Sequence, residues 1–326
     1  MIQKHLSKII YLIAVSVIFA SCTFDELYYS TDTNCHIRLH VDWTQTKFRL
    51  NGASVYVYHK TGDLYKAFPP FSNPYTIDLA LPKGDYNLVL HNNTPYELPN
   101  LNFYGLEHAE TLRVGPVMNT DPNYKLTSVL EPDDLGLAHL TDLTVTETMI
   151  DYFPFKPGSA DHRTFKEFDL MVESVVTEIE IIVHVTGLNN ASAAPPSEFR
   201  NVSGGLYMMT KKKQEELVTH HFILNNRTFD PGSNKNGTIR KTLKCFGPVD
   251  DKTVDNLLLM NFKLANGEQH PVLLNATDKL EKISDLKYRV RLECTLPDVP
   301  AVGEGDSGFD PGVEDWEDIE VDIPMG

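Results

Sequence analysis

The chain has 326 residues, with 45 acidic residues against 29 basic ones and a formal net charge of −16 at pH 7. Phosphate binding needs clustered lysine and arginine, so nucleic acid is excluded as an expected partner. The one basic run, Lys211–Lys213, is followed by Glu215 and Glu216 and is expected to be a solvated turn or strand end. At about 100 to 200 residues per domain, the length predicts two domains.

The first 21 residues have the pattern of an export signal. Lys4, His5 and Lys8 give a basic start, and the uncharged run Ile9–Ala20 follows. This run is much shorter than the ~20 residues of a membrane-spanning helix, which indicates a signal peptide over residues 1–21. Because the segment removes Lys4 and Lys8 and no acid, the formal charge of the remaining chain falls from −16 to −18.

Cys22 follows two small residues, and the segment Phe19–Cys22 resembles a bacterial lipobox. The resemblance implies a diacylglycerol on the Cys22 thiol, cleavage before it and acylation (palmitate) of the new amine. Several acyl chains hold a protein stably on its membrane. Residues 22–32 would then be a lipidated tether, and Asp25 and Glu26 resemble a label for the outer face of the outer membrane. The alternative is a cleaved secretory signal in which Cys22 is incidental.

The dominant period after the tether is two, which predicts strands with one buried face. In the first half, Cys35, Ile37, Leu39 and Val41 alternate with polar residues. The turn residues Pro82-Lys83-Gly84 separate two further alternating runs and predict a hairpin. We expect a first β-sandwich over residues 33–155.

A second β-sandwich is expected over residues 156–296. The run Glu178–Val185 alternates, as does Tyr288–Cys294, and Ala265–Glu268 carries the Asn-Gly pair of a hairpin. Helical signals are short, over Asp278–Leu286 and Asp133–Leu143. The predicted fold class is therefore all-β, with two antiparallel sandwiches of transthyretin-like or immunoglobulin-like type.

The tail over residues 297–326 is rich in glycine and acid and ends in the alternating strip Trp316–Ile323. Its apolar residues, Trp316, Ile319, Val321 and Ile323, are candidates for a strand that pairs with a partner. The alternatives are an edge strand of the second sandwich and a calcium loop, although the regular spacing of an EF-hand loop is missing.

The remaining residue patterns give little sign of chemistry. Cys245 and Cys294 lie in strand-like segments, so a disulfide between them and buried free thiols are both open, with Cys35 as the third cysteine. His36 and His40 lie about 13 Å apart on a strand, too far to share a metal. No catalytic, metal or cofactor-binding residue is expected. The aromatic stretches Tyr56–Tyr58 and Phe68–Phe71 suit either core packing or sugar binding.

A set of short segments follows a characteristic order along the chain: the lipobox, His40–Trp43, Leu81–Tyr86 with Leu90–Asn92, Val185–Leu188, Val202–Gly205 and Trp316–Ile323. Together these segments resemble the fimbrillin-like surface lipoproteins of Bacteroidota, especially the branch near minor and anchoring fimbrial subunits. The resemblance implies two transthyretin-like sandwiches, a lipid-held base and fimbrial subunits as partners. It also implies that an anchor retains its first strand, here Cys35–Val41, which stalk subunits lose.

Together, these expectations predict an outer-membrane lipoprotein that faces the cell exterior. It would act as a fimbrial anchor or minor assembly subunit and pair with its partners by strand addition. The alternative is a surface glycan- or protein-binding lipoprotein. A glycosidase is a third class, since paired carboxylates are recognised by their separation in space and not in sequence.

Overall fold

The computed structural model describes residues 34–47, 49–121, 126–150, 164–193, 195–249, 251 and 253–299. Within these ranges the chain forms strands and short 3-10 turns, without an α-helix. The 3-10 turns are η1 (Pro95–Glu97), η2 (Glu147–Met149), η3 (Leu188–Asn190) and η4 (Thr277–Lys279). None of the helical turns in this part of the chain has the length and apolar character needed to cross a bilayer. The prediction of an all-β fold is confirmed.

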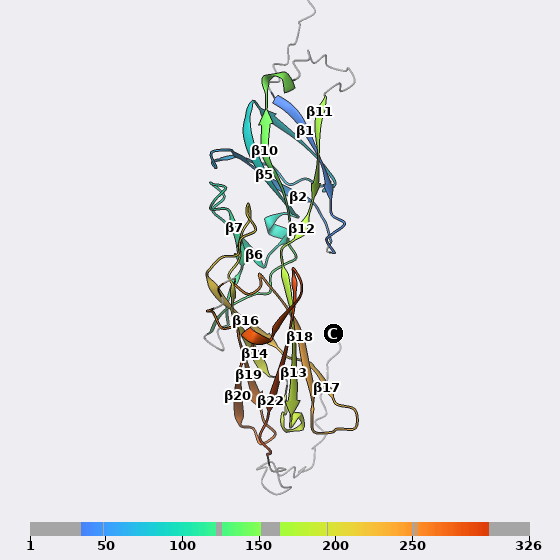
Figure 1. Cartoon of the computed structure of the whole chain (residues 1–326), viewed down its shortest axis with the longest axis vertical. Coiled ribbons are helices and arrows are strands. Elements are labelled where there is room, and N and C mark those ends of the chain that lie inside the picture. Colours follow the sequence, from blue (N-terminus) through green and yellow to red (C-terminus); the bar gives the residue numbers. More distant parts are fainter. Residues whose placement is uncertain are drawn as a thin grey trace, which may run out of the picture. The chain divides into compact units, whose positions relative to one another are not determined.

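The chain divides into two compact units whose sequences interleave (Figure 1). Unit 1 takes its residues from Met1–Thr94, Gly105–Thr111 and Gly136–Ser174, and unit 2 from Pro95–Tyr104, Leu112–Leu135 and Val175–Gly326. Pro95–Tyr104 and Leu112–Leu135, which were expected to belong to the first sandwich, therefore pack in unit 2. The expected boundary between residues 155 and 156 lies outside the described residues.

Unit 1 is a sandwich of two sheets. Sheet 1A has the order β11 (Phe165–Met171), β1 (Asn34–Asp42), β4 (Thr76–Pro82). Sheet 1B has the order β12 (Glu173–Ser174), β10 (Gly136–Val145), β5 (Gly84–Asn92), β2 (Ala53–His59), β3 (Leu64–Ala67). The core contains alternate residues of both sheets, among them Ile37, Leu39 and Val55, which are fully buried.

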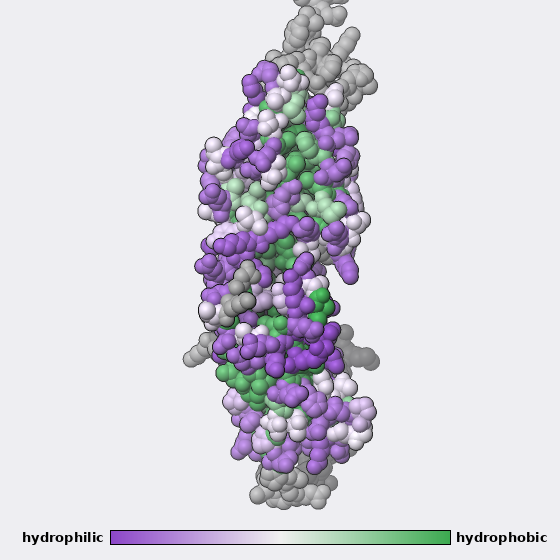
Figure 2. Space-filling model, viewed as in Figure 1, coloured by the Kyte–Doolittle hydropathy of each residue, from purple (hydrophilic) through white to green (hydrophobic). Residues whose placement is uncertain are grey.

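Unit 2 is a larger sandwich. Sheet 2A has the order β17 (Asn226–Phe229), β18 (Gly237–Cys245), β13 (Thr177–Thr186), β22 (Lys287–Thr295), β21 (Leu280–Ser284). Sheet 2B has the order β20 (Gln269–Asn275), β19 (Leu257–Lys263), β14 (Pro196–Ser203), β16 (Leu217–Ile223), β9 (Leu126–Val129), β8 (Met118–Asp121). A small third sheet has the order β15 (Leu206–Tyr207), β7 (Arg113–Pro116), β6 (Leu101–Tyr104). Figure 2 shows a hydrophobic patch over β14, β19 and β20. In β20, Leu273 is 56% exposed.

Both units contain the same seven-strand connectivity when β12 is left aside in unit 1 and β6–β9, β15, β17 and β21 are left aside in unit 2. The seven strands are β1–β5, β10 and β11 in unit 1, and β13, β14, β16, β18–β20 and β22 in unit 2. In each unit the first strand lies between the fourth strand, antiparallel to it, and the last strand, parallel to it: β4–β1–β11 in unit 1 and β18–β13–β22 in unit 2. The second sheet has the order sixth, fifth, second, third strand in both units. The sandwiches are therefore not purely antiparallel, because the closing strand of each lies parallel to the opening strand.

Three local predictions differ from the structure. Pro82-Lys83-Gly84 is not a hairpin turn, because β4 belongs to sheet 1A and β5 to sheet 1B, so the segment is a corner between the two sheets. The segments expected as short helices form mainly strands: Asp133–Leu143 leads into β10, and Asp278–Leu286 contains the end of η4 and β21. In each case cross-strand pairing outweighs a weak local helical preference. The Asn266-Gly267 hairpin between β19 and β20 is confirmed, with Gly267 at φ +88°.

A strap over residues 130–135 lies against one edge of sheet 2A. Glu131 Oε1 lies 2.5 Å from Lys241 Nζ, and Glu131 Oε2 accepts the backbone N–H of Lys244 at 3.2 Å. Asp134 Oδ1 accepts from Lys244 Nζ at 2.8 Å, and Asp133 Oδ2 accepts the N–H of Asn100 at 2.8 Å. Because β17 pairs only with Gly237–Arg240, these carboxylates cover the part of β18 that β17 leaves open.

Candidate functional site

The candidate site is the first strand, β1, and the groove that it fills between β4 and β11. The predicted strand residues Cys35, Ile37, Leu39 and Val41 all lie in β1 and face the core, with exposed fractions of 5% or less. β1 pairs with β4 over Asn34–His40 and with β11 over His36–Asp42. The strand is therefore central in its sheet, and its backbone groups are engaged on both sides.

Polar side chains on the outer face of β1 contact both neighbouring strands. The Arg38 guanidinium donates two hydrogen bonds to Asp78 of β4, from Nε to Oδ1 at 2.8 Å and from Nη2 to Oδ2 at 2.9 Å. The same guanidinium lies 3.9 Å from the ring centroid of Phe165 in β11. Arg38 thus links the three strands of sheet 1A in a fork geometry that lysine does not reproduce.

Removal of β1 would leave a groove one strand wide. The floor would lose the side chains of Ile37, Leu39 and Val41, each contributing about 1.5 to 3 kcal/mol by burial. Both β4 and β11 would present unpaired N–H and C=O groups toward the gap. Only an extended segment with alternating apolar residues satisfies both requirements at once.

The first strand of unit 2 has the same central position but differs in its connection. In its sheet, β13 lies between β18 and β22. In the chain, it follows β12 of unit 1 and precedes β14 of unit 2. Its inward residues Ile179, Ile181, Val183 and Val185 are fully buried. In unit 1, by contrast, β1 precedes every other described strand, so a single cut between β1 and β2 separates it from the other strands of the described chain.

The three cysteines of the described ranges are free thiols. The disulfide considered for Cys245 and Cys294 is not formed, because Cys245 pairs with Thr177 at one end of β13 and Cys294 with Val185 at the other. Eight residues of strand separate the two positions by roughly 26 Å, against less than about 7 Å between the Cα atoms of a disulfide. Burial raises the pKa of Cys245 to about 12 and that of Cys294 to about 11.

The aromatic stretches lie in the core. Tyr56 and Tyr58 are 7% and 0% exposed, and Phe68 and Phe71 pack against the core of unit 1. Core packing accounts for Tyr56 and Tyr58, and Phe68 and Phe71 are half-buried against the core. Within the part of the chain that the structure describes, no group of three or more His, Cys, Asp or Glu residues has a metal-binding arrangement.

The other predicted site residues lie outside the described residues. These are the lipidation residue Cys22 and the partner-strand residues Trp316, Ile319, Val321 and Ile323, together with the signal peptide 1–21 and the tether 22–32. Of the tail 297–326, residues 297–299 are described. The side-chain amide of Asn190 donates to the carbonyl of Pro297 at 2.9 Å, and Leu296 donates its N–H to Thr186.

A family model described as a domain of unknown function (DUF5119) matches residues 21–222, more than half of the chain. The chain belongs to the DUF5119 family. The match covers all the described residues of unit 1 and continues into β16 of unit 2, as far as residue 222. Among curated proteins, none matches this DUF5119 chain.

A solved structure shares the fold of this DUF5119 protein. A candidate adhesin from Bacteroides ovatus ATCC 8483 has a TM-score of 0.57 at 16% identity, over 82% of this chain and 94% of the other. The fimbrial anchor protein Mfa2 from Porphyromonas gingivalis has a TM-score of 0.48 at 10% identity, over 80% and 90% of the two chains. A second candidate adhesin from Bacteroides ovatus has a TM-score of 0.47 at 10% identity, over 82% of this chain and 89% of the other. The predicted resemblance to fimbrillin-like proteins of Bacteroidota is confirmed.

Two contacts of the site were not expected from the sequence. Arg38 and Phe165 are 127 positions apart, and their approach follows from the parallel pairing of β1 with β11. In the sequence, Asp78 is a polar residue of an alternating segment, and nothing there singles it out as a partner of Arg38. The one signal in the sequence was the charge alternation of Arg38 and Asp78 on the polar faces of two strands, which does not reveal that these strands pair.

Proposed function

We propose that this protein is an outer-membrane lipoprotein, held through acyl chains on Cys22 and facing the cell exterior, that acts as a fimbrial anchor or minor assembly subunit. The observation that carries the proposal is the central position of β1, whose four inward side chains fill the core of unit 1. A subunit that keeps this strand is complete and has no open groove in sheet 1A. Because it offers no groove to a donated strand, such a subunit would form one end of a series of subunits joined by strand addition.

The partner surface in this proposal is the C-terminal strip with Trp316, Ile319, Val321 and Ile323. From Asp318 onward acidic and apolar residues alternate, so an extended strip would put Ile319, Val321 and Ile323 on one face and Trp316 on the other. The face with Ile319, Val321 and Ile323 suits a groove with an apolar floor and two unpaired strand edges. The strip would enter a groove of a neighbouring subunit that has lost its own first strand. The acidic residues Asp318, Glu320 and Asp322 alternate with the apolar ones and would face solvent.

The lipid anchor is tested by metabolic labelling with a palmitate analogue. The wild-type chain should incorporate label and fractionate with the outer membrane, and Cys22→Ser should lose both properties, with Cys35→Ser as the matched control. Equal labelling of wild type and Cys22→Ser would contradict the anchor.

The partner role is tested by deletion of residues 316–326. Wild type should co-purify with fimbrial subunits from solubilised outer membrane, and the deletion variant should lose them while keeping its melting temperature. Undiminished recovery of these subunits with the deletion variant would refute the role of the strip. Loss of the melting transition would instead assign the strip to the folding of unit 2, as an edge strand.

A further inference from the structure

A row of alternating aromatic and cationic side chains crosses the small sheet of unit 2. Tyr104 of β6 pairs directly with Arg113 of β7, and Arg113 pairs with Tyr207 of β15. The N–H of Tyr207 donates to the carbonyl of Lys212 at 2.8 Å, next to the bridge between Leu206 and Lys213. Directly paired residues lie on the same face of a sheet. Tyr104, Arg113, Tyr207 and Lys212 therefore form one row, the ladder.

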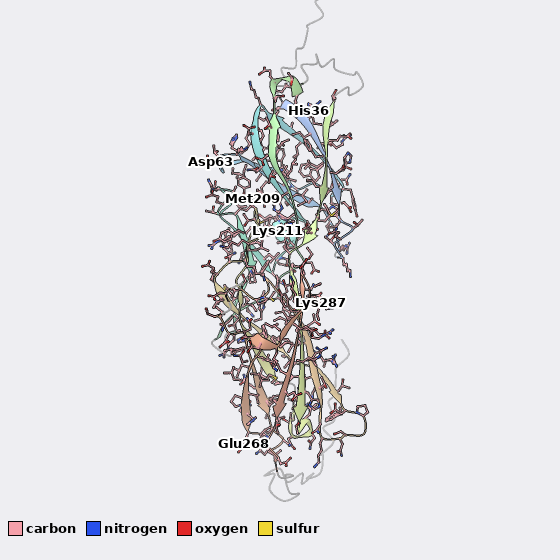
Figure 3. All side chains as sticks on the ribbon, viewed as in Figure 1. His36, Asp63, Met209, Lys211, Glu268 and Lys287 are labelled. Atoms are coloured by element: carbon pink, nitrogen blue, oxygen red, sulfur yellow. The ribbon has the colours of Figure 1, made fainter. Side chains whose placement is uncertain are left out.

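The ladder faces outward. Its opposite face carries Val114 and Leu206, which are 0% and 3% exposed. On the ladder itself Tyr104 is 42% exposed, and both Arg113 and Lys212 are exposed. Figure 3 labels Lys211, which precedes Lys212 in the loop after β15. The core packing that explains Tyr56 and Tyr58 does not explain these rings.

The two cations of the ladder have no carboxylate partner among residues of the described ranges. The guanidinium of Arg113 lies 5.4 Å from the ring centroid of Tyr104, and the ammonium of Lys212 forms no ion pair there. Other cations of unit 2, such as Lys241 and Lys244, are paired with acids. In a chain of net charge −16, exposed and unpaired cations between tyrosines form a local site for an anion.

A pocket of about 440 Å³ adjoins the cationic end of the ladder. Its lining includes Lys212, Lys213, Gln214, Glu215 and Asp251. Lys213 donates from Nζ to the carbonyl of Pro248 at 2.7 Å, and Thr253 donates its N–H and O–H to Asp251 at 2.8 and 2.7 Å. These bonds hold two lining side chains in place. The lining therefore also contains two carboxylates, those of Glu215 and Asp251, and neither forms an ion pair with Lys212 in the described part of the chain.

We propose that the ladder and its pocket form a binding site for an acidic oligosaccharide. The tyrosine faces would stack on sugar rings, Arg113 and Lys212 would bind the sugar carboxylates, and Glu215 and Asp251 would accept hydrogen bonds from hydroxyl groups. Tyr104 and Tyr207 are two strand spacings apart, roughly 10 Å. This spacing suits an oligosaccharide and exceeds a single sugar. The site is separate from the anchoring role and does not depend on it.

The test measures binding of tetragalacturonic acid to the full-length protein in detergent by isothermal titration calorimetry. Galactotetraose is the neutral comparison and a polyglutamate peptide the acidic protein comparison. The variants are Arg113→Ala, Lys212→Ala and Tyr104→Ala, with Lys235→Ala as the control because it is an exposed cation of unit 2 away from the ladder. Thermal melts check that each variant is folded.

We expect tetragalacturonic acid to bind the wild-type protein. Arg113→Ala or Lys212→Ala should weaken this binding about tenfold or more, and Lys235→Ala should leave it unchanged. Arg113→Lys should recover only part of the loss, because an ammonium does not stack as a guanidinium does. The proposal is overturned if the acid does not bind, if galactotetraose binds as well, or if only the polyglutamate peptide binds. Since the assay contains no fimbrial partner, its outcome is independent of the anchoring experiments.

Discussion

Glu131 and Lys241 form an ion pair of 2.5 Å, 110 positions apart, that fastens the strap to β18 of unit 2. Both side chains are about one-third exposed or less, at 32% and 26%. The other oxygen of Glu131 accepts the backbone N–H of Lys244 on the edge that β17 does not cover. The pair therefore joins a segment inserted between β5 and β10 to the edge of a sheet formed much later in the chain.

Glu131→Gln is expected to destabilise unit 2 by about 1 to 2 kcal/mol, because the ion pair is lost and the single amide oxygen of glutamine cannot replace both carboxylate oxygens as acceptors for Lys241 and the Lys244 N–H. Urea denaturation at pH 7 measures the change. Glu268→Gln in the exposed turn after β19 is the control and should leave the midpoint unchanged. Equal midpoints for wild type and Glu131→Gln would show that the strap is held by its other contacts.

Leu39→Ala is expected to cost about 2 to 5 kcal/mol, because Leu39 is fully buried in the central strand of sheet 1A. His40→Ala, one position along on the outer face, should cost much less, since the His40 ring and its partner Glu167 are both largely exposed. Chemical denaturation of the two variants distinguishes them. Similar losses for both would contradict the inward and outward assignment of β1.

The stability of unit 2 should fall as the pH drops from about 6.5 toward 4. Burial lowers the pKa of His220 to about 4, from an ordinary value of 6.5 in the unfolded chain. The folded state therefore binds fewer protons in this window, and its stability is full above 6.5 and is lost progressively below it, by up to about 3 kcal/mol. Lys241, which is paired with Glu131, also disfavours the charged ring.

His220→Phe removes this titration and should reduce the pH dependence of the denaturation midpoint between pH 7 and 4.5. His270→Phe, on the partly exposed edge strand β20, is the control. An unchanged pH dependence in His220→Phe would mean that other groups account for the acid sensitivity. His91, whose pKa burial also lowers to about 4, contributes a similar dependence in unit 1.

Cys245 and Cys294 should remain reduced and unreactive in the folded protein. Burial keeps both thiols protonated at neutral pH, and only the thiolate attacks a disulfide reagent. Ellman's reagent should label neither until denaturant is added. A peptide linked by Cys245 and Cys294 in non-reducing mass spectrometry would contradict the strand register.

Cleavage between residues 150 and 164 should leave the two fragments associated. The N-terminal fragment contains Pro95–Tyr104 and Leu112–Leu135, which are parts of unit 2. Size-exclusion chromatography after engineered cleavage in this segment checks the expectation. A chain that begins at residue 164, expressed alone, should have a lower midpoint, because it lacks the strap and the strands β8 and β9 beside β16.

The period-two pattern alone determined the strands that carry the cores. Ile37 and Leu39 in β1, or Ile179 and Ile181 in β13, alternate because one face of each strand is buried, and that is a local property. The Asn266-Gly267 hairpin was predictable for the same reason, since a two-residue turn fixes its own backbone geometry. The sequence pattern likewise contained the lipobox and the acidic tail.

Only the tertiary structure decided which strands pair. Pro82-Lys83-Gly84 has the composition of a hairpin turn, yet it joins two sheets: β4 pairs with β1 and β5 pairs with β2, and the inward residues of β4 and β5 meet in one core. The strap of Glu131, the contact of Arg38 with Phe165 and the Tyr104–Arg113–Tyr207–Lys212 row all depend on residues far apart in the chain. Non-local pairing is set by the sum of burial over both sheets, which no short window of sequence contains.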